Sequence, residues 1–88
     1  MIEETLIVKN QKGIHTRPAA VLVKTAAKFS SDFTIIKDGI SINGKSIIGV
    51  MSLAAEEGAE LTVRIEGGDE KEAFEAIKNV FERGFDED

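Results

Sequence analysis

The sequence contains no cysteine, which excludes disulfide scaffolds, thiolate nucleophiles and thiol redox chemistry. It also lacks any apolar run that approaches the length of a membrane span, so we expect no membrane insertion. The segment Met1-Ile2-Glu3-Glu4 has neither the basic nor the apolar region of a secretory signal peptide, and we therefore expect a cytoplasmic protein. With 88 residues, the chain is predicted to form a single domain over residues 1–88 with one modest core.

Basic residues are outnumbered by acidic ones, and the net charge is −5. An acidic chain argues against direct nucleic-acid binding, which favours a basic surface. The charge is unevenly distributed, because the segment 9–28 contains no acidic residue and carries the basic residues Lys9, Lys12, Arg17, Lys24 and Lys28. We therefore expect a basic face in this part of the molecule, suited to acidic partners.

Histidine occurs only once, in the run Gly13-Ile14-His15-Thr16-Arg17-Pro18. Pro18 is typical of the first turn of a helix, and Thr16 is an acceptable N-cap there. An imidazole in front of the free N–H groups of a helix, with Arg17 nearby, is suited to an anion bonded to the ring, so a phosphohistidine at His15 is the leading hypothesis. A surface histidine without chemistry is the alternative. Zinc sites gather several histidine or cysteine ligands, and neither a metal nor another cofactor is expected.

The hydrophobic pattern predicts alternating strands and helices. Strands are expected at residues 2–8, 33–37, 40–42 and 59–65, and helices at 17–28, 47–53 and after Asp69. The pairs Asp38-Gly39 and Asn43-Gly44 are typical turn signals. The order β-α-β-β-α-β-α, with amphipathic helices, predicts an α+β two-layer sandwich that has its helices on one side of an antiparallel sheet. Phe85 extends the packing of the last helix in this interpretation, and residues 86–88 fray.

The segment Gly39 to Ser46 matches the phosphate-loop pattern G-x-x-x-x-G-K-[ST]. A phosphate loop lies between a buried parallel strand and a helix and holds phosphates with its free N–H groups. Here Ile40-Ser41-Ile42 is predicted to be a strand between two turns, which would engage those N–H groups in the sheet. We therefore reject nucleotide hydrolysis.

Ser46 precedes the second predicted helix and has two compatible interpretations. Its hydroxyl can serve as an N-cap, which stabilises a helix by about 1 kcal/mol. It can also be a phosphorylation site, because a phosphate is tolerated at a helix N-terminus while it changes the charge of the nearby surface.

The helix 47–53 has more apolar residues than one face can bury. Val50 and Leu53 are expected to face inward, which would leave Ile48 and Met51 in an exposed patch suited to docking. A fully buried helix is the alternative.

Two segments carry a family resemblance: Gly13-Ile14-His15-Thr16-Arg17-Pro18-Ala19-Ala20 and Lys45-Ser46-Ile47-Ile48-Gly49-Val50-Met51-Ser52-Leu53. Together with the Glu57-Gly58-Ala59 turn and the order of elements, they resemble HPr, the histidine-containing phosphocarrier family of the bacterial phosphoenolpyruvate:sugar phosphotransferase system. The resemblance runs along essentially the whole chain. It implies an open-faced sandwich with strand order 1-4-2-3 and three helices on one face of the sheet.

The resemblance also implies a carrier role in sugar transport. His15 would accept a phosphoryl group on Nδ1 from the phosphohistidine of enzyme I and pass it to a sugar-specific IIA domain. Arg17 would stabilise the phosphoryl charge beside the helix N–H groups that begin near Thr16. Such a protein is a covalently modified carrier and not an independent enzyme.

Ser46 resembles a regulatory site that an ATP-dependent HPr kinase/phosphorylase modifies, which links the protein to a catabolite-control repressor and carbon catabolite repression. The shared docking surface implied by the resemblance comprises Ala20, Lys24, Ile47, Ile48 and Met51. The competing hypothesis is a regulatory interaction module that acts through the Ser46 surface and seldom uses His15. Nothing in the sequence demands more than a monomer.

Overall fold

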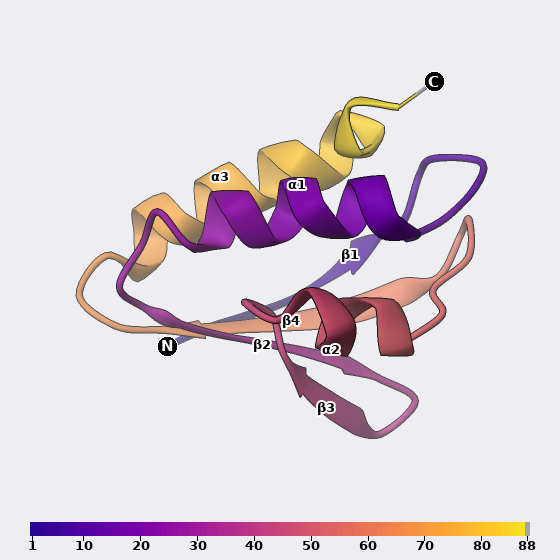
Figure 1. The fold of residues 1–88 in the computed structure, drawn as a ribbon. Coiled ribbons are helices and arrows are strands. Elements are labelled where there is room, and N and C mark those ends of the chain that lie inside the picture. The colour runs from indigo at the N-terminus through magenta and orange to yellow at the C-terminus, as the bar shows by residue number, and fades with distance from the viewer. Residues whose placement is uncertain (88) are drawn as a thin grey trace.

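The structure, a computed structural model, describes residues 1–87 and shows a four-stranded sheet with three α-helices against one face (Figure 1). The strands are β1 (Ile2–Ile7), β2 (Asp32–Lys37), β3 (Ile40–Asn43) and β4 (Glu60–Glu66). The helices are α1 (Thr16–Ala26), α2 (Ile47–Ser52) and α3 (Glu70–Glu82), followed by a 3₁₀ turn, η1 (Gly84–Asp86). The predicted α+β sandwich and its β-α-β-β-α-β-α order are confirmed.

The sheet has the order β1-β4-β2-β3, and all three strand pairs are antiparallel. This is the 1-4-2-3 order implied by the family resemblance. The β2–β3 hairpin turns at Asp38 and Gly39, whose φ angles of 51° and 81° are both positive. A type I′ turn requires positive φ at both central residues, which is why the Asp-Gly pair predicted this hairpin correctly.

The core lies between the sheet and the helices. Alternate residues of β4, namely Leu61, Val63 and Ile65, are fully buried, as period-two patterning requires. The helices contribute one stripe each, which includes Ala19, Leu22 and Ala26 of α1 and Ala73, Ile77, Val80 and Phe81 of α3. Amphipathic helices on one face of an antiparallel sheet therefore bury their apolar sides against it.

The segment that matches the phosphate-loop pattern forms β3 and a tight turn. Ile40 to Asn43 pair with β2, and the N–H group of Gly44 donates to the carbonyl oxygen of Phe33 at 2.7 Å. These main-chain groups are engaged in the sheet and cannot enclose a phosphate. The prediction that Ile40-Ser41-Ile42 form a strand between two turns is confirmed.

Helix α1 differs from its predicted bounds of 17–28. It begins one residue earlier because His15, in an extended conformation with φ −104° and ψ −161°, is the N-cap residue. The carbonyl oxygen of His15 accepts the N–H of Ala19 at 3.0 Å and closes the first turn. The prediction that Thr16 caps the helix is therefore wrong, since Thr16 is its first residue.

The C-terminal segment was predicted to fray from residue 86, and this prediction is wrong for Asp86 and Glu87. Asp86 ends η1, and Glu87 packs against the start of α1. Phe85 is fully buried, with its ring centroid 4.9 Å from that of Phe81. This aromatic contact anchors the segment, so the prediction that Phe85 extends the packing is confirmed. Residue 88 lies outside the described residues.

Within residues 1–87, no helix combines the length and the apolar character that a membrane crossing requires.

Candidate functional site

The loop between β1 and α1 is held at several points, and it places His15 at the helix start. The side-chain Nδ2 of Asn10 donates to the carbonyl oxygen of Gly13 at 2.6 Å, while the N–H of Gly13 donates back to the carbonyl oxygen of Asn10 at 3.2 Å. The N–H of buried Ile14 donates to the carbonyl oxygen of Ala55 at 2.9 Å, which joins the loop to the segment after α2. These hydrogen bonds hold the backbone of residues 10–14, which directly precede His15.

Glycine is required at residue 13. Its φ angle is +69°, and a Cβ atom there would overlap the carbonyl oxygen of Ala55. The loop can approach the α2–β4 segment this closely only without a side chain at this position. The tight turn and the position of His15 therefore depend on Gly13.

His15 is accessible at the N-terminus of α1, with 42% of its side chain exposed. The N–H groups of Thr16 and Arg17 donate to no acceptor within residues 1–87, and Pro18 has no N–H to donate. The free N–H groups and the positive end of the helix dipole favour a bound anion. Arg17, the second residue of the helix, is exposed and lines a surface hollow together with Glu87.

Glu87 was not predicted to belong to this site, yet it contacts the imidazole directly. Its Oε1 and Oε2 lie 3.1 and 3.0 Å from Nε2 of His15, and its Oε1 also accepts from Nδ2 of Asn10 at 3.0 Å. Burial raises the pKa of the Glu87 carboxyl, but the hydrogen bonds from Asn10 and His15 and the nearby charges of His15 and Arg17 outweigh it. The net pKa is below its ordinary value.

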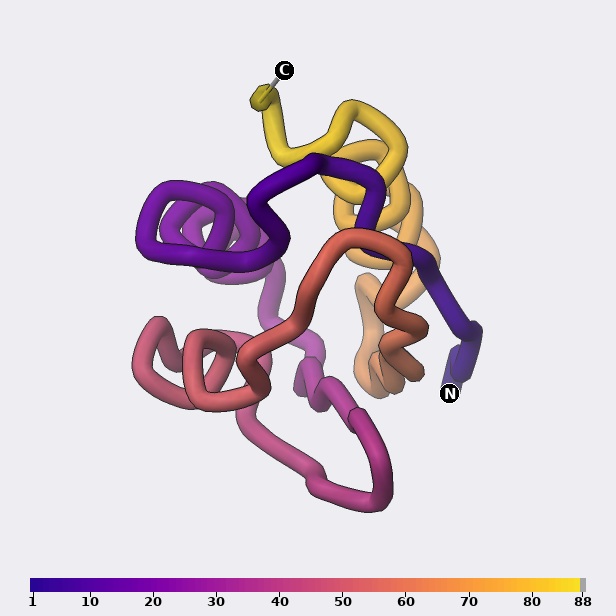
Figure 2. The backbone as a smooth tube through the Cα atoms, turned by 90° about the vertical axis from the view of Figure 1, so that its right-hand side faces the viewer, coloured from indigo at the N-terminus to yellow at the C-terminus, as the bar shows by residue number. Residues whose placement is uncertain are grey.

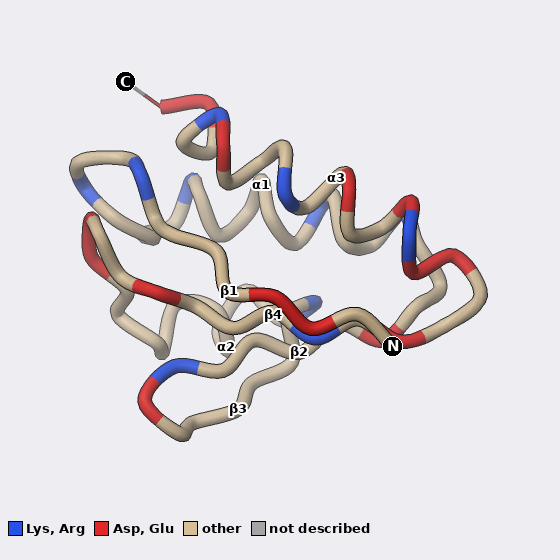
Figure 3. Tube along the Cα trace, turned by 180° about the vertical axis from the view of Figure 1, so that it is seen from behind, with Lys and Arg blue, Asp and Glu red and all other residues tan. Residues whose placement is uncertain are grey.

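The C-terminal segment therefore lies beside the β1–α1 loop, as Figure 2 shows where the yellow end of the tube passes close to the indigo loop. A surface hollow between them is lined by Gln11, Lys12, Arg17, Asp86 and Glu87. The five basic residues of the segment 9–28 are all exposed, as expected, and Figure 3 shows acidic stretches on β1, α3 and the C-terminal segment. Asp86 and Glu87 line the same hollow as Lys12 and Arg17, so acidic side chains lie among the basic ones beside the β1–α1 loop.

Ser46 is the N-cap of α2, as predicted. Its hydroxyl oxygen accepts the N–H of Gly49 at 3.1 Å, and its extended backbone precedes the first helical residue. Ser46 lies at the opposite end of α2 from Ala55, the residue that contacts the His15 loop.

Helix α2 exposes an apolar surface. Val50 and Leu53 are buried, whereas the exposed fractions are 41% for Ile47, 83% for Ile48 and 39% for Met51. The prediction of an exposed patch is confirmed, and the alternative of a fully buried helix is wrong. Isolated exposed apolar residues are common, but three on a short helix form a patch suited to a partner.

Helix α1 packs beside α2 (Figures 1 and 2). Ala20 is half-buried and Lys24 is exposed. They are four residues apart and therefore share one side of α1. We use the name α1–α2 surface for the docking residues that the family resemblance implies, namely Ala20, Lys24, Ile47, Ile48 and Met51.

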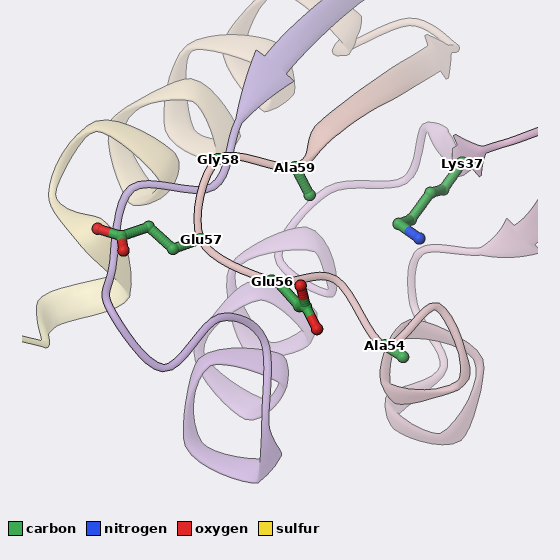
Figure 4. Close-up of a pocket in the computed structure, with 6 residues that line it drawn as sticks. All are labelled: Lys37, Ala54, Glu56, Glu57, Gly58 and Ala59. Carbon is green, nitrogen blue, oxygen red and sulfur yellow. The ribbon is translucent and has the colours of Figure 1, made fainter.

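A second hollow, drawn in Figure 4, is lined by Lys37 and by residues of the segment between α2 and β4, namely Ala54, Glu56, Glu57, Gly58 and Ala59. The side chains of Glu56 and Glu57 point in different directions there and do not converge on one point. Within residues 1–87, no group of three or more histidine, cysteine or acidic side chains could hold a metal ion.

Two residues of the site, Asn10 and Glu87, escaped the sequence analysis. Asn10 lies in a loop that contains glycine, and asparagine is favoured in turns because its side chain bonds to nearby main-chain groups. There is little indication in the sequence that Glu87 belongs to the site, because an acidic run near a chain terminus is more typical of exposed, poorly ordered residues. The aromatic Phe85 directly after Gly84 was the available indication that the end is anchored.

Comparison with known proteins agrees with this geometry. The sequence model of a family described as "PTS HPr component phosphorylation site" matches residues 2–83. Phosphocarrier protein HPr from Xylella fastidiosa (strain 9a5c) is 48% identical over 88 residues, which cover 100% of this chain and 99% of that protein. The crystal structure of HPr-C-His from Thermoanaerobacter tengcongensis superimposes with a TM-score of 0.95 at 44% identity and covers 100% of this chain and 99% of that one.

A further similar structure is that of Crh, the catabolite repression containing protein of Bacillus subtilis, solved as a domain-swapped dimer. It has a TM-score of 0.76 and 39% identity, and the match covers 96% of this chain and 97% of that one. The matched family model, the identities and the shared fold extend over nearly all of the chain. The chain therefore belongs to the HPr family of phosphocarriers of the phosphotransferase system.

Proposed function

We propose that His15 is the residue through which this phosphocarrier works, accepting a phosphoryl group from phosphorylated enzyme I and passing it to sugar-specific IIA domains. The observation that carries the proposal is the position of the imidazole, accessible in front of the two free N–H groups of α1 and beside Arg17. We place this activity in the cytoplasm, as expected for the family.

The transfer is a displacement at phosphorus. The lone pair of the His15 Nδ1 forms the new bond to phosphorus, and the bond from phosphorus to the nitrogen of the donor histidine breaks, so that its electron pair returns to the donor ring. The neutral imidazole is nucleophilic near neutral pH. The N–H groups of Thr16 and Arg17 and the guanidinium of Arg17 then face the phosphoryl oxygens.

The strength of this stabilisation suits a carrier. A buried site with several cationic side chains would bind the phosphoryl group too tightly for onward transfer. One arginine and one helix N-terminus neutralise its negative charge only in part. The protein in this proposal needs an enzyme or domain on both sides of its cycle. It is a covalently modified intermediary and not an independent catalyst.

The α1–α2 surface is the docking surface in this proposal. Its exposed apolar residues, Ile47, Ile48 and Met51, can pack into a partner while Lys24 at its border contacts acidic groups. Methionine adapts to differently shaped partners, which suits a protein that must meet both enzyme I and IIA domains.

Ser46 is the proposed regulatory site, modified by an ATP-dependent HPr kinase/phosphorylase. A phosphate there has oxygens that can replace the hydroxyl as acceptor for the N–H of Gly49, so α2 would persist. It would also add nearly two negative charges next to Ile47 and Ile48, which changes the partners that the surface favours. A catabolite-control repressor is the proposed partner of the modified form.

The second candidate function is a regulatory interaction module without phosphoryl transfer, and the similarity to Crh favours it. The accessible imidazole at the start of α1 favours the carrier. Incubation with enzyme I, phosphoenolpyruvate and Mg²⁺ separates the two, because phosphohistidine is acid-labile and base-stable whereas phosphoserine survives acid. We further propose that the carrier acts as a monomer.

A further inference from the structure

The contact between Glu87 and His15 brings the last described residue of the chain to the reactive ring. Both carboxylate oxygens face Nε2, at 3.1 and 3.0 Å, and only 13% of the Glu87 side chain is exposed. Because a carboxylate only accepts hydrogen bonds, the nitrogen it faces must carry a proton. The neutral ring then has its lone pair on Nδ1.

Asn10 fixes the carboxylate in turn. One N–H of its amide donates to Oε1 of Glu87 at 3.0 Å, while its second N–H is directed to the carbonyl oxygen of Gly13 at 2.6 Å. Asn10 is buried, with 3% of its surface exposed. The amide therefore ties Glu87 to the same loop that positions the backbone of His15.

The segment that delivers Glu87 has a costly backbone conformation. Gly84, Phe85 and Asp86 all have positive φ angles, at 63°, 58° and 63°. A left-handed conformation is unfavourable for residues other than glycine and persists only where the surroundings enforce it. Here the fully buried ring of Phe85 holds it, and Arg83 and Asp86 form an exposed ion pair, 2.9 Å long, in the same turn. The chain thus turns sharply back toward α1 directly before Glu87.

We propose that Glu87 is a positioning residue for phosphoryl transfer, which holds His15 through Nε2–H so that Nδ1 is the nitrogen that accepts the phosphoryl group. This inference rests on the proposed function of His15. In the transfer the P–Nδ1 bond forms and the bond from phosphorus to the donor nitrogen breaks, while the proton stays on Nε2. The hydrogen bond from Nε2–H to Glu87 therefore persists through the step, because Nε2 is not the nitrogen that bonds to phosphorus.

The test compares two variants that each remove one negative charge. Glu87→Gln replaces the carboxylate by an amide that can donate as well as accept, so the ring is no longer restricted to one tautomer. Glu82→Gln removes an exposed acid near the end of α3 and serves as the matched control. Backbone ¹H–¹⁵N spectra and thermal unfolding verify that both variants keep the fold.

Two readouts are measured on both variants and on the unaltered chain. The first is kcat/KM for phosphoryl transfer from phosphorylated enzyme I. The second is the ¹⁵N spectrum of the His15 ring in its neutral form, which distinguishes protonated Nε2 from protonated Nδ1. For Glu87→Gln we expect kcat/KM to fall roughly five-fold, the difference between a charged and a neutral hydrogen bond, together with an increase in the Nδ1–H form. Glu82→Gln should match the unaltered chain in both.

Equal rates for the two variants would overturn this inference alone, provided that the unaltered chain is phosphorylated. A slower Glu87→Gln whose ring spectrum is unchanged would also overturn it, since the effect would then not pass through the tautomer. No phosphorylation of the unaltered chain by an active enzyme I would overturn the proposed function of His15 and this inference with it.

Discussion

At the residue scale, single side chains accept hydrogen bonds from main-chain N–H groups near the ends of helices and strands. Asp69 shows this most clearly, because its carboxylate accepts the N–H groups of Ser30 and Ser31 at 2.9 and 3.0 Å as well as the hydroxyl of Ser31. It thereby connects the start of α3 to the loop before β2. These hydrogen bonds, led by that from the Ser31 hydroxyl, lower the pKa of Asp69 from an ordinary 3.8 to about 2.

This shift predicts a pH dependence of stability. A carboxyl whose pKa is lower in the folded state stabilises the fold fully above its unfolded value, and that contribution is lost as the pH falls through the folded value. We therefore expect the unfolding temperature to decline between pH 4 and pH 2, in part through Asp69. In Asp69→Asn the decline should be shallower, which thermal unfolding at pH values across this window measures. An identical slope in both proteins would contradict the assignment.

His15 and Thr16 show what the sequence allows at this scale. The sequence predicted a helix start at this place from Pro18, and the start is there. It could not distinguish which residue is the cap, because the N-cap is defined by backbone angles and both candidates precede the same helix. The extended conformation of His15 follows from the Gly13 and Ile14 contacts, which are tertiary.

At the element scale, α2 has a buried apolar side and an exposed apolar side. Val50 is fully buried, whereas Ile48 is its most exposed apolar residue, at 83%. The two kinds of residue alternate along only two turns of helix. Substitutions on the two sides should therefore have opposite consequences.

We expect Ile48→Asp to change the free energy of unfolding by less than about 0.5 kcal/mol, because an exposed side chain loses little on substitution. The same change should raise KM for phosphoryl transfer from enzyme I by roughly ten-fold, the effect of losing one apolar contact in an interface. Urea unfolding and transfer kinetics measure the two effects. An unaltered KM would remove Ile48 from the docking surface.

Val50→Ala is the matched control within α2. It should cost about 2 kcal/mol of stability through the cavity that it leaves, while transfer below the unfolding temperature keeps its rate. A large kinetic effect of this buried substitution would show that the kinetic readout reports the integrity of α2 and not docking.

Most elements were predictable because their signals are local. The turn pairs Asp38-Gly39 and Asn43-Gly44 delimit β3, and period-two burial identifies β4 without knowledge of its neighbours. The C-terminal segment was not predictable in this way. Its order comes from Phe85 packing on Phe81 and from Glu87 bonding to residues 10 and 15, which are contacts between the two ends of the sequence.

At the scale of the whole molecule, the first and the last described segments both belong to one fold. Strand β1 pairs with β4 from Ile2↔Ile65 to Ile7↔Glu60, and the C-terminal segment closes over the β1–α1 loop. Every strand within residues 1–87 finds its partner in the same chain. The described fold is thus complete without exchange of a segment with a second copy.

We accordingly expect a monomer of 9.5 kDa in solution, in contrast to the domain-swapped dimer described for Crh. Sedimentation equilibrium over a range of concentrations measures the mass directly. A stable species of twice the monomer mass at low concentration would contradict the prediction.

The central claim is that His15 accepts and passes on the phosphoryl group, and one measurement tests this claim most directly. The unaltered chain and His15→Ala are incubated with enzyme I, phosphoenolpyruvate and Mg²⁺ and then analysed by intact mass and ³¹P NMR. We predict one acid-labile, base-stable phosphoryl group on the unaltered chain and none on His15→Ala, which should keep its fold because the ring is partly exposed. Phosphorylation of His15→Ala at a comparable rate, or an acid-stable phosphate on the unaltered chain, would contradict the account.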